Sequence, residues 1–590
     1  MENETSAPVL EPLISEEESL AGESDQPTAA VEDTGPWLEI IPLGGAGDIG
    51  KNMVAVRYGE DIVVIDAGVA FPTEEHPGVD LIIPDITFLR ENAANVRAIV
   101  LTHAHEDHIG ALPYVLKQLN VPVYGTPLTL GLVRCKLEEH KLLDQVKLHT
   151  YVPGEQVTFG EITVEPIQVT HSIPDTVSLA LFTPAGTIVH TGDFKIDQTP
   201  IDGKLFDASR FAQLGDAGVL VLISDSTNAE RPGWVPSERL VGRFFDKEFR
   251  ESRGRVLVTT FASNIHRVQT VFDMAARYDR KVAVAGRSMA RNIEVARELG
   301  FIKYKDTNRI RVEEIGDYHP AEIVILTTGS QGEPLSALSR MSQDDHKIRI
   351  EPGDTVILSS KPIPGNEDAV WRTVNRLFRR GARVLYDMIA PVHVSGHGNQ
   401  EELKLMYNLT RPEYVIPYHG EPRMMSAYAD MVEEMGHDSD KILFVEIGDR
   451  LVFAKDEEEK TTTRYLDPIE SAGSVLVDGI SEGGVSEFIL RDRRHLADNG
   501  TVIVTVGLDR ATGEIVYGPD LISRGFLHPE DSEELFEGAR AKVIEILETM
   551  EQEEDADWDN VRTSLRDTVS RYLRKKTNRR PVVIPVVMEI

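Results

Sequence analysis

One ten-residue stretch, LTHAHEDHIG from Leu101 to Gly110, constrains this chain more than any other. It begins on the last residue of the apolar run from Val96 to Leu101, which predicts a buried strand that ends where the polar residues begin. Imidazole and carboxylate groups suit Zn²⁺ or Mn²⁺. The H-x-H-x-D-H spacing allows the first two histidines to face one ion and the Asp-His pair to face another. A solvated polar loop would explain a lone histidine, but not four ligand-type residues at a strand end, namely His103, His105, Asp107 and His108.

The composition of the 590 residues, 41% hydrophobic and 27% charged, is that of a soluble globular protein with several domains. No apolar run has the length of a membrane span, and the first residues lack the pattern of a signal peptide. We therefore expect a cytoplasmic protein without a membrane partner. The single cysteine, Cys135, excludes an internal disulfide and a thiolate cage, so any metal must be held by histidine and carboxylate.

The formal charge of −35 argues against a polyanionic partner when it is taken alone. The acidic residues are segregated, however, because residues 1–36 contain Asp and Glu but no Lys or Arg, and residues 551–559 form a second acidic run. Local basic patches could therefore still bind nucleic acid. The basic run from Arg571 to Arg580 either contacts RNA or is a solvated helix end.

The hydrophobic pattern divides the chain into segments. Residues 1–36 are expected to be disordered. The pattern of residues 37–225 predicts closely spaced strands. Over residues 226–385, strands alternate with helices, which predicts a parallel sheet covered by helices. Ligand-type histidines return in 386–455, so the alternating domain is expected to be an insertion. A linker at 456–468 and a small α+β domain at 469–590 follow.

Two tempting signals are interpreted as structural. Gly45 to Gly50 forms a formal G-x-G-x-x-G, but a dinucleotide site needs a helix after the glycines. Met53 to Arg57 alternates like a strand, so we expect a glycine-rich hairpin connection. His190 lies inside an apolar strand and is expected to be a core or supporting histidine.

A pair of divalent ions about 3.5–4 Å apart needs roughly seven ligands, including a bridging carboxylate. The chain offers His103, His105 and His171 for one ion. It offers Asp107, His108 and His419 for the other, with Asp193 as the bridge. Asp66, at the end of its own strand, is expected to orient either a ligand imidazole or the hydroxide bound between the ions.

These residues carry a family resemblance. Thr102 to Gly110, with Asp66, His171 and Asp193, resembles the motif set of the metallo-β-lactamase fold. The stretch from Asp225-Ser226-Thr227 through His397 to His419 resembles the extra motifs of its β-CASP branch. Further motifs are similar to bacterial ribonuclease J: Gly44 to Met53, Phe261-Ala262-Ser263-Asn264, Gly329 to Pro334, His393-Val394-Ser395-Gly396-His397 and Arg491 to Arg494.

The resemblance implies a metallo-β-lactamase αββα sandwich with an inserted parallel-sheet β-CASP domain and a small α+β C-terminal domain. It also implies a 5′-to-3′ exonuclease and endonuclease that acts in RNA maturation and decay on single-stranded RNA with a 5′-monophosphate. A homodimer or homotetramer, possible RNA-decay partners, and two divalent ions per site (Zn²⁺ or Mn²⁺, with Mg²⁺ possible) are implied as well.

The resemblance also implies site roles, residue by residue. Substrate-binding residues would be Ala262, Ser263, Asn264, His393, Val394, Ser395, Gly396 and His397. Catalytic residues would be Asp66, Asp107, Asp193, Asp225 and His397.

Structural alternatives stay open for several of these residues. Ser263 and Asn264 could cap a helix, and Gly329 to Pro334 could be a tight turn. His393 could only support His397, which either protonates the leaving oxygen or binds phosphate.

Three competing functions also remain. These are a small-molecule hydrolase on the same metal fold, a non-catalytic RNA-degradation scaffold and a DNA-cutting β-CASP enzyme. Contacts to the 2′-hydroxyl separate the last from a ribonuclease.

Overall fold

The computed structural model describes residues 37–590 except Glu74, Pro334, Pro364, Glu457, Glu459, Ile480, 483–484, Ala511, Gly513, His528 and 551–557. The disorder expected for residues 1–36 therefore lies outside the described residues, as does most of the acidic run at 551–559. Within the described part, no helix combines the length and the apolar character that crossing a membrane requires.

Two sheets pack face to face in the first domain. One sheet has the spatial order β21 (Thr461–Leu466), β20 (Arg450–Lys455), β1 (Leu38–Gly44), β2 (Met53–Tyr58), β3 (Asp61–Ile65), β5 (Val96–Val100), β6 (Val123–Gly125) and β7 (Leu148–Thr150). The other has the order β19 (Tyr414–Tyr418), β12 (Val221–Asp225), β11 (Gly186–His190), β10 (Val177–Thr183), β9 (Ile162–Gln168) and β8 (Val157–Phe159). Alternate residues such as Val56, Val100 and Leu179 point between the sheets and form one buried cluster.

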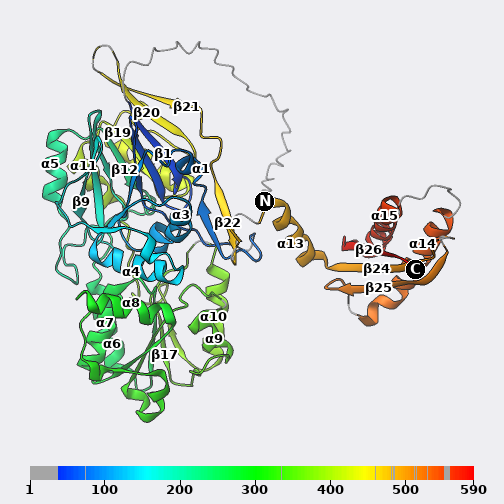
Figure 1. Cartoon of the computed structure of the whole chain (residues 1–590). Helices are drawn as coiled ribbons and strands as arrows, with labels where there is room; N and C mark the ends of the chain where they lie inside the picture. The colour runs from blue at the N-terminus through cyan, green and yellow to red at the C-terminus, as the bar shows by residue number, and fades with distance from the viewer. Residues whose placement is uncertain are drawn as a thin grey trace, which may run out of the picture. The chain divides into compact units, whose positions relative to one another are not determined.

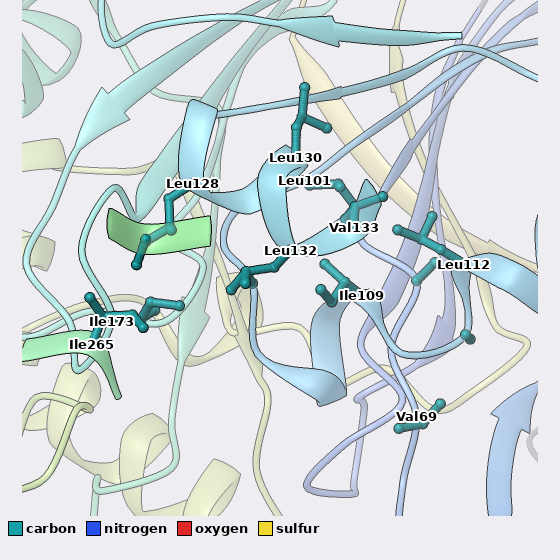
Figure 2. Packing of buried hydrophobic residues seen from close by; sticks show 14 of the residues in the cluster. Val69, Leu101, Ile109, Leu112, Leu128, Leu130, Leu132, Val133, Ile173 and Ile265 are labelled. Atoms are coloured by element: carbon teal, nitrogen blue, oxygen red, sulfur yellow. The ribbon is translucent and has the colours of Figure 1, made fainter. Parts of the chain in front are cut away.

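Helices cover the outer face of each sheet. The first is covered by α1 (Thr87–Glu91), α2 (Glu106–Ile109), α3 (Leu112–Gln118) and α4 (Pro127–Glu139), and the second by α5 (Ala208–Ala217), α11 (Gln400–Thr410) and α12 (Pro422–Glu434). Figure 2 shows Leu101 and Ile109, on either side of the ligand stretch, within the first of these cores. The expected αββα layers are confirmed.

The glycine-rich stretch after β1 leads into a strand. β1 pairs antiparallel with β2, so Gly45 to Gly50 connects two neighbouring strands and precedes no helix. The interpretation as a hairpin connection is confirmed, and a dinucleotide site is excluded there.

An all-parallel sheet forms the second domain (Figure 1). Its order is β15 (Arg309–Ile310), β14 (Lys281–Ala285), β16 (Ile323–Thr327), β13 (Val256–Thr259), β17 (Thr355–Leu358) and β18 (Arg383–Leu385). One face packs on α6 (Arg239–Glu251), α7 (Ile265–Arg277) and α8 (Arg287–Glu298), and the other on α9 (Ala337–Gln343) and α10 (Glu367–Arg379). Both faces are covered, which is why its strands are apolar throughout.

The chain returns to the first domain after this sheet. β19 pairs with β12, and β20 pairs with β1, although more than 180 residues separate the members of each pair. The parallel-sheet domain is therefore inserted into the sandwich, as expected. The two cores are continuous, since Ile173 of the sandwich and Ile265 of α7 belong to one cluster (Figure 2).

The last segment contains a strand pairing that the sequence did not predict. β4 (Leu81–Pro84) pairs with β22 (Ser474–Asp478), which also pairs with β23 (Ser481–Glu482). After α13 (Glu487–Asn499), the sheet β25 (Ile515–Arg524), β24 (Thr501–Leu508) and β26 (Val582–Glu589) packs on α14 (Pro529–Met550) and α15 (Trp558–Thr577) (Figure 1). Short 3-10 turns occur at Leu143–Gln145, Asp306–Asn308, Val312–Asp317, Pro320–Glu322 and Ser439–Lys441.

Candidate active site

Strand ends gather the polar residues at one place. Asp66 follows β3, the ligand stretch follows β5, Asp193 follows β11, Asp225 ends β12 and His419 follows β19. β3 lies parallel to β5, and β11, β12 and β19 are consecutive parallel neighbours. The carboxyl ends of parallel strands meet at the same edge of a sheet, so residues far apart in the sequence converge here.

Two groups of ligand-type side chains share Asp193. His103, His105, His171 and Asp193 form one, and Asp107, His108, Asp193 and His419 form the other, with ligand atoms within 4.8 Å of one another in each group. Both Oδ atoms of Asp193 are buried without a hydrogen-bond partner among the described residues. A buried carboxylate with no donor is costly, and bound cations would compensate it. The residues therefore fit divalent metal ions.

Neighbouring groups orient the histidine ligands. Asp66 Oδ2 lies 2.7 Å from His108 Nδ1, and Asp66 Oδ1 accepts a hydrogen bond from the backbone N–H of Thr102 at 2.8 Å. His108 therefore carries its hydrogen on Nδ1 and presents the lone pair of Nε2 to the site. Asp66 and His419 have left-handed backbones, with φ of 60° and 50°, a strain that recurs at functional sites.

Electrostatics divides the histidines into two sets. Burial lowers the pKa of His103 and His171 well below the usual value and that of His105 to about 4. Those three rings are neutral at pH 7, which is the form that binds a metal. Burial opposes protonation of His108 and His419 too, but the Asp193 carboxylate raises the pKa of His108 well above its usual value and that of His419 to about 10. Positive charge is therefore most favourable at these two rings, and a metal ion bound there would displace the added protons and leave the rings neutral.

Sequence reasoning missed two residues that hold the ligand stretch in place. The backbone N–H and the Nδ2 of Asn52 both donate to the carbonyl oxygen of Asp107, at 3.0 and 3.2 Å. Gly68 approaches the same carbonyl so closely that a Cβ there would lie 1.6 Å from it. Asn52 belongs to the Gly44 to Met53 motif, which was the only available signal.

His397 faces the metal ligands from the loop after the inserted domain. Its Nδ1 lies 2.8 Å from Asp225 Oδ2, and its Nε2 lies 3.8 Å from Asp193 Oδ2. Burial opposes protonation, but Asp225 raises the pKa of His397. With 21% of its side chain exposed, His397 can carry a proton and meet a substrate.

The structure places the remaining substrate-binding candidates in two stretches. Asn264 Oδ1 accepts from the backbone N–H of Arg267, so the helix-capping role holds for Asn264. The carbonyl of Ala262 accepts from Asn292. Ser263 lies between them, ahead of α7, and Arg267 of that helix donates to the carbonyl of Val392 at 3.0 Å. The start of α7 is therefore tied to Val392, two residues ahead of the loop of Val394, Ser395 and Gly396.

His393 lies on the buried side of that loop. Burial, with Arg267 next, lowers the pKa of His393 well below its usual value. His393 is therefore neutral, and its Nδ1 is buried without a partner among the described residues. The role of His393, in phosphate binding or in support of His397, stays a prediction.

The layers and the clustered ligands define the class: a metallo-hydrolase of the metallo-β-lactamase superfamily with an inserted β-CASP domain. The "Metallo-beta-lactamase superfamily" matches residues 46–228, and the "Zn-dependent metallo-hydrolase RNA specificity domain" matches 381–442. The "Ribonuclease J, beta-CASP domain" matches 253–377, and the "Ribonuclease J C-terminal domain" matches 488–590. The chain belongs to the ribonuclease J family.

Relatives match along almost the whole chain. Ribonuclease J2 of Bacillus subtilis is 42% identical over 94% of this chain and 99% of its own. Ribonuclease J of Thermus thermophilus is 44% identical over 94% of this chain and 95% of its own. A crystal structure of a protein of unknown function from Enterococcus faecalis, 16% identical, shares the fold with a TM-score of 0.50 over 70% of this chain and 100% of that one. The expected resemblance, fold class and enzyme class, a metal-dependent ribonuclease, are confirmed.

Proposed function

We propose that this chain is a two-metal ribonuclease that degrades single-stranded RNA from its 5′ end, prefers a 5′-monophosphate, and also cuts internally. One observation carries the proposal: two groups of metal ligands share the buried Asp193, and the loop of Ser395 to His397 lies directly beside them. The shared carboxylate suits hydrolysis of a phosphodiester, and the adjacent loop suits recognition of a terminal phosphate. We propose the domain ranges that the sequence predicts: 37–225 and 386–455 for the sandwich, 226–385 for the inserted domain, and 469–590 for the C-terminal domain.

One ion would be held by His103, His105 and His171, and the other by Asp107, His108 and His419. Asp193 would bind both ions. Two divalent ions supply a water of lowered pKa and charge stabilisation for the oxygens of the displacement. The donor set accepts Zn²⁺ and Mn²⁺, with Mg²⁺ possible. Asp66 keeps the His108 ring in the orientation that metal binding through Nε2 requires.

His397 is proposed to hold a proton close to the scissile phosphate. Asp225 accepts from Nδ1 and favours the protonated ring, so Nε2 can donate toward an oxygen of the substrate. A protonated Nε2 can also bind a phosphate oxygen. The position of His397 supports both roles, because its ring lies between Asp225 and Asp193.

The 5′-phosphate is proposed to bind at Ser395, Gly396 and His397, with Ser263 and the start of α7 behind them. Hydroxyl groups, backbone N–H groups and an imidazolium are the donors that a phosphate monoester requires. A pocket filled by one phosphate leaves no room for a triphosphate, so the state of the RNA end would gate degradation. Single-stranded RNA is thus the proposed partner, together with a homodimer or homotetramer of this chain and possible RNA-decay proteins.

The test is a product ladder from one RNA sequence, labelled at the 3′ end or the 5′ end, with a 5′-monophosphate, triphosphate or hydroxyl. We expect mononucleotides from the 5′ end, released fastest from the monophosphate, lost with EDTA and restored by Mn²⁺ or Zn²⁺. Absence of RNA cleavage with every metal would contradict the proposal. In the same assay, Ser395→Ala should erase the preference for monophosphate, and an unchanged preference would place the pocket elsewhere.

A further inference from the structure

Asn228 lies in the turn after β12, is 4% exposed and contacts the proposed phosphate loop. Its Nδ2 lies 2.8 Å from Ser395 Oγ and 2.8 Å from the carbonyl oxygen of His397. A carbonyl oxygen only accepts hydrogen bonds, so the nitrogen of the amide, not its oxygen, must face it. This contact determines the orientation of the Asn228 amide, and Asn228 must therefore donate to Ser395.

The hydroxyl of Ser395 receives a second donor. The backbone N–H of His397 donates to Ser395 Oγ at 3.1 Å. A hydroxyl oxygen has two lone pairs and one hydrogen, and here N–H donors face both lone pairs. The hydrogen must therefore point away from Asn228 and from the backbone of His397. In the part of the chain that the structure describes, no acceptor takes that hydrogen.

We propose that Asn228 is a positioning residue that turns Ser395 into an obligate hydrogen-bond donor for the terminal phosphate of the RNA. The proposal deepens the proposed function and rests on its 5′-end pocket. A phosphate monoester near pH 7 is mostly a dianion, with a second pKa of about 6, and offers oxygens that only accept. A freely rotating serine could also accept, and would then favour water or a 5′-hydroxyl equally well.

The same turn holds His397 at two points. Asp225 Oδ2 lies 2.8 Å from the ring Nδ1, and Asn228, three residues later, holds the carbonyl of His397. Loss of Asn228 would therefore slow hydrolysis of every RNA through His397. Loss of the Ser395 donor would instead slow only RNAs that end in a phosphate. The two effects differ in kinetics, since the first changes kcat/KM for all ends and the second changes the ratio between ends.

The experiment measures kcat/KM of the full-length, metal-loaded protein on two RNAs that differ only in a 5′-monophosphate or a 5′-hydroxyl. Asn228→Asp keeps the shape but replaces the donor by an oxygen, toward which the Ser395 hydrogen would turn. We expect the monophosphate-to-hydroxyl ratio to fall by about tenfold or more, because a hydrogen bond to a charged group is lost. Asn228→Ala should lower the ratio less. Ser395→Ala combined with Asn228→Asp should lower it no further than Ser395→Ala alone.

Asn408→Asp, which introduces the same charge at an exposed position of α11, is the matched control and should keep the wild-type ratio. Thermal unfolding shows whether each variant is folded. If Asn228→Asp does not fold, the ratio measured for Asn228→Ala decides the role of Asn228. A wild-type ratio in Ser395→Ala would contradict the pocket itself. A lowered ratio in Ser395→Ala with wild-type ratios in both Asn228 variants would overturn the role of Asn228 alone.

Discussion

His171 Nδ1 lies 2.8 Å from the carbonyl oxygen of Gly396, a residue 225 positions later in the chain. Because a carbonyl only accepts, His171 must carry its hydrogen on Nδ1 and keep the lone pair of Nε2 for the metal site. The loop proposed to bind the 5′-phosphate thus also orients a proposed metal ligand. Disturbing the loop should therefore disturb metal binding as well.

Gly396→Ala tests this connection. A Cβ at position 396 would lie 2.5 Å from His171 Cε1, so the ring must shift. We expect weaker metal binding, about 10- to 100-fold as for other changes beside metal ligands, measured by titration with Zn²⁺ or Mn²⁺. Gly316→Ala is the control, since a Cβ there meets nothing within 4 Å. Unchanged metal affinity in Gly396→Ala would show that His171 does not depend on this loop.

Asp107→Ala should abolish RNA cleavage while the protein stays folded. The change removes one proposed ligand and the carboxylate that lies 3.4 Å from His419 Nε2. The metal content of the purified variant, measured by mass spectrometry, should fall by about one ion per chain if two ions are bound. Turnover at the wild-type rate would contradict the two-metal proposal.

Arg267→Met should destabilise the inserted domain. Arg267 is fully buried, forms an ion pair with Glu238 at 2.5 Å, and donates to the carbonyl of Val392. Removing one partner of a buried ion pair leaves an uncompensated charge, at a cost of about 3–5 kcal/mol. Urea denaturation should show a clearly lower midpoint.

The control for that variant is Arg277→Met on the same helix, because the Arg277 side chain that pairs with Asp246 is 62% exposed. Exposed pairs contribute at most about 1 kcal/mol, so this midpoint should stay near that of the wild type. Similar midpoints for both variants would mean that the buried pair contributes little.

Glu402→Gln should change the pH dependence of stability. Burial raises the pKa of Glu402 to about 7, well above the value expected in the unfolded chain. The folded state therefore binds this proton more tightly, and the resulting stability is present below the unfolded pKa and lost as pH rises through 7. The difference in thermal midpoint between wild type and variant should shift in favour of the variant between pH 5 and pH 8. A difference that is constant with pH would contradict the raised pKa.

Several features of this fold follow from local patterns. Every residue of Val96–Val100 except the half-buried Arg97 is apolar and buried, so the strand before the ligand stretch could be recognised. The alternation of apolar strands with helices likewise predicted the parallel sheet. Its strands are apolar because helices cover both faces of the sheet. The roles of the seven proposed ligands stay predictions, although the structure does bring their ligand atoms within 4.8 Å in each group.

Other features depend on partners that no local pattern identifies. The pairing of β4 with β22 joins segments almost 400 residues apart, and nothing in either segment identifies the other as its partner. Asn264 has both a capping and a phosphate-binding interpretation in the sequence, and only the contact with Arg267 shows the cap. The contacts of Asn52 and Asn228 were not predicted for the same reason, since asparagine is common in turns.

The sequence by itself determined which chemical groups are present and that several of them end apolar strands. Those two properties suffice to predict a metal site of histidine and carboxylate, because ligand type follows from residue type and strand ends are rigid. Only the tertiary structure decided which nitrogen of His171 is free and which way the hydroxyl of Ser395 points. Such details depend on hydrogen bonds between segments far apart in the chain, and packing of the two domains sets their distances.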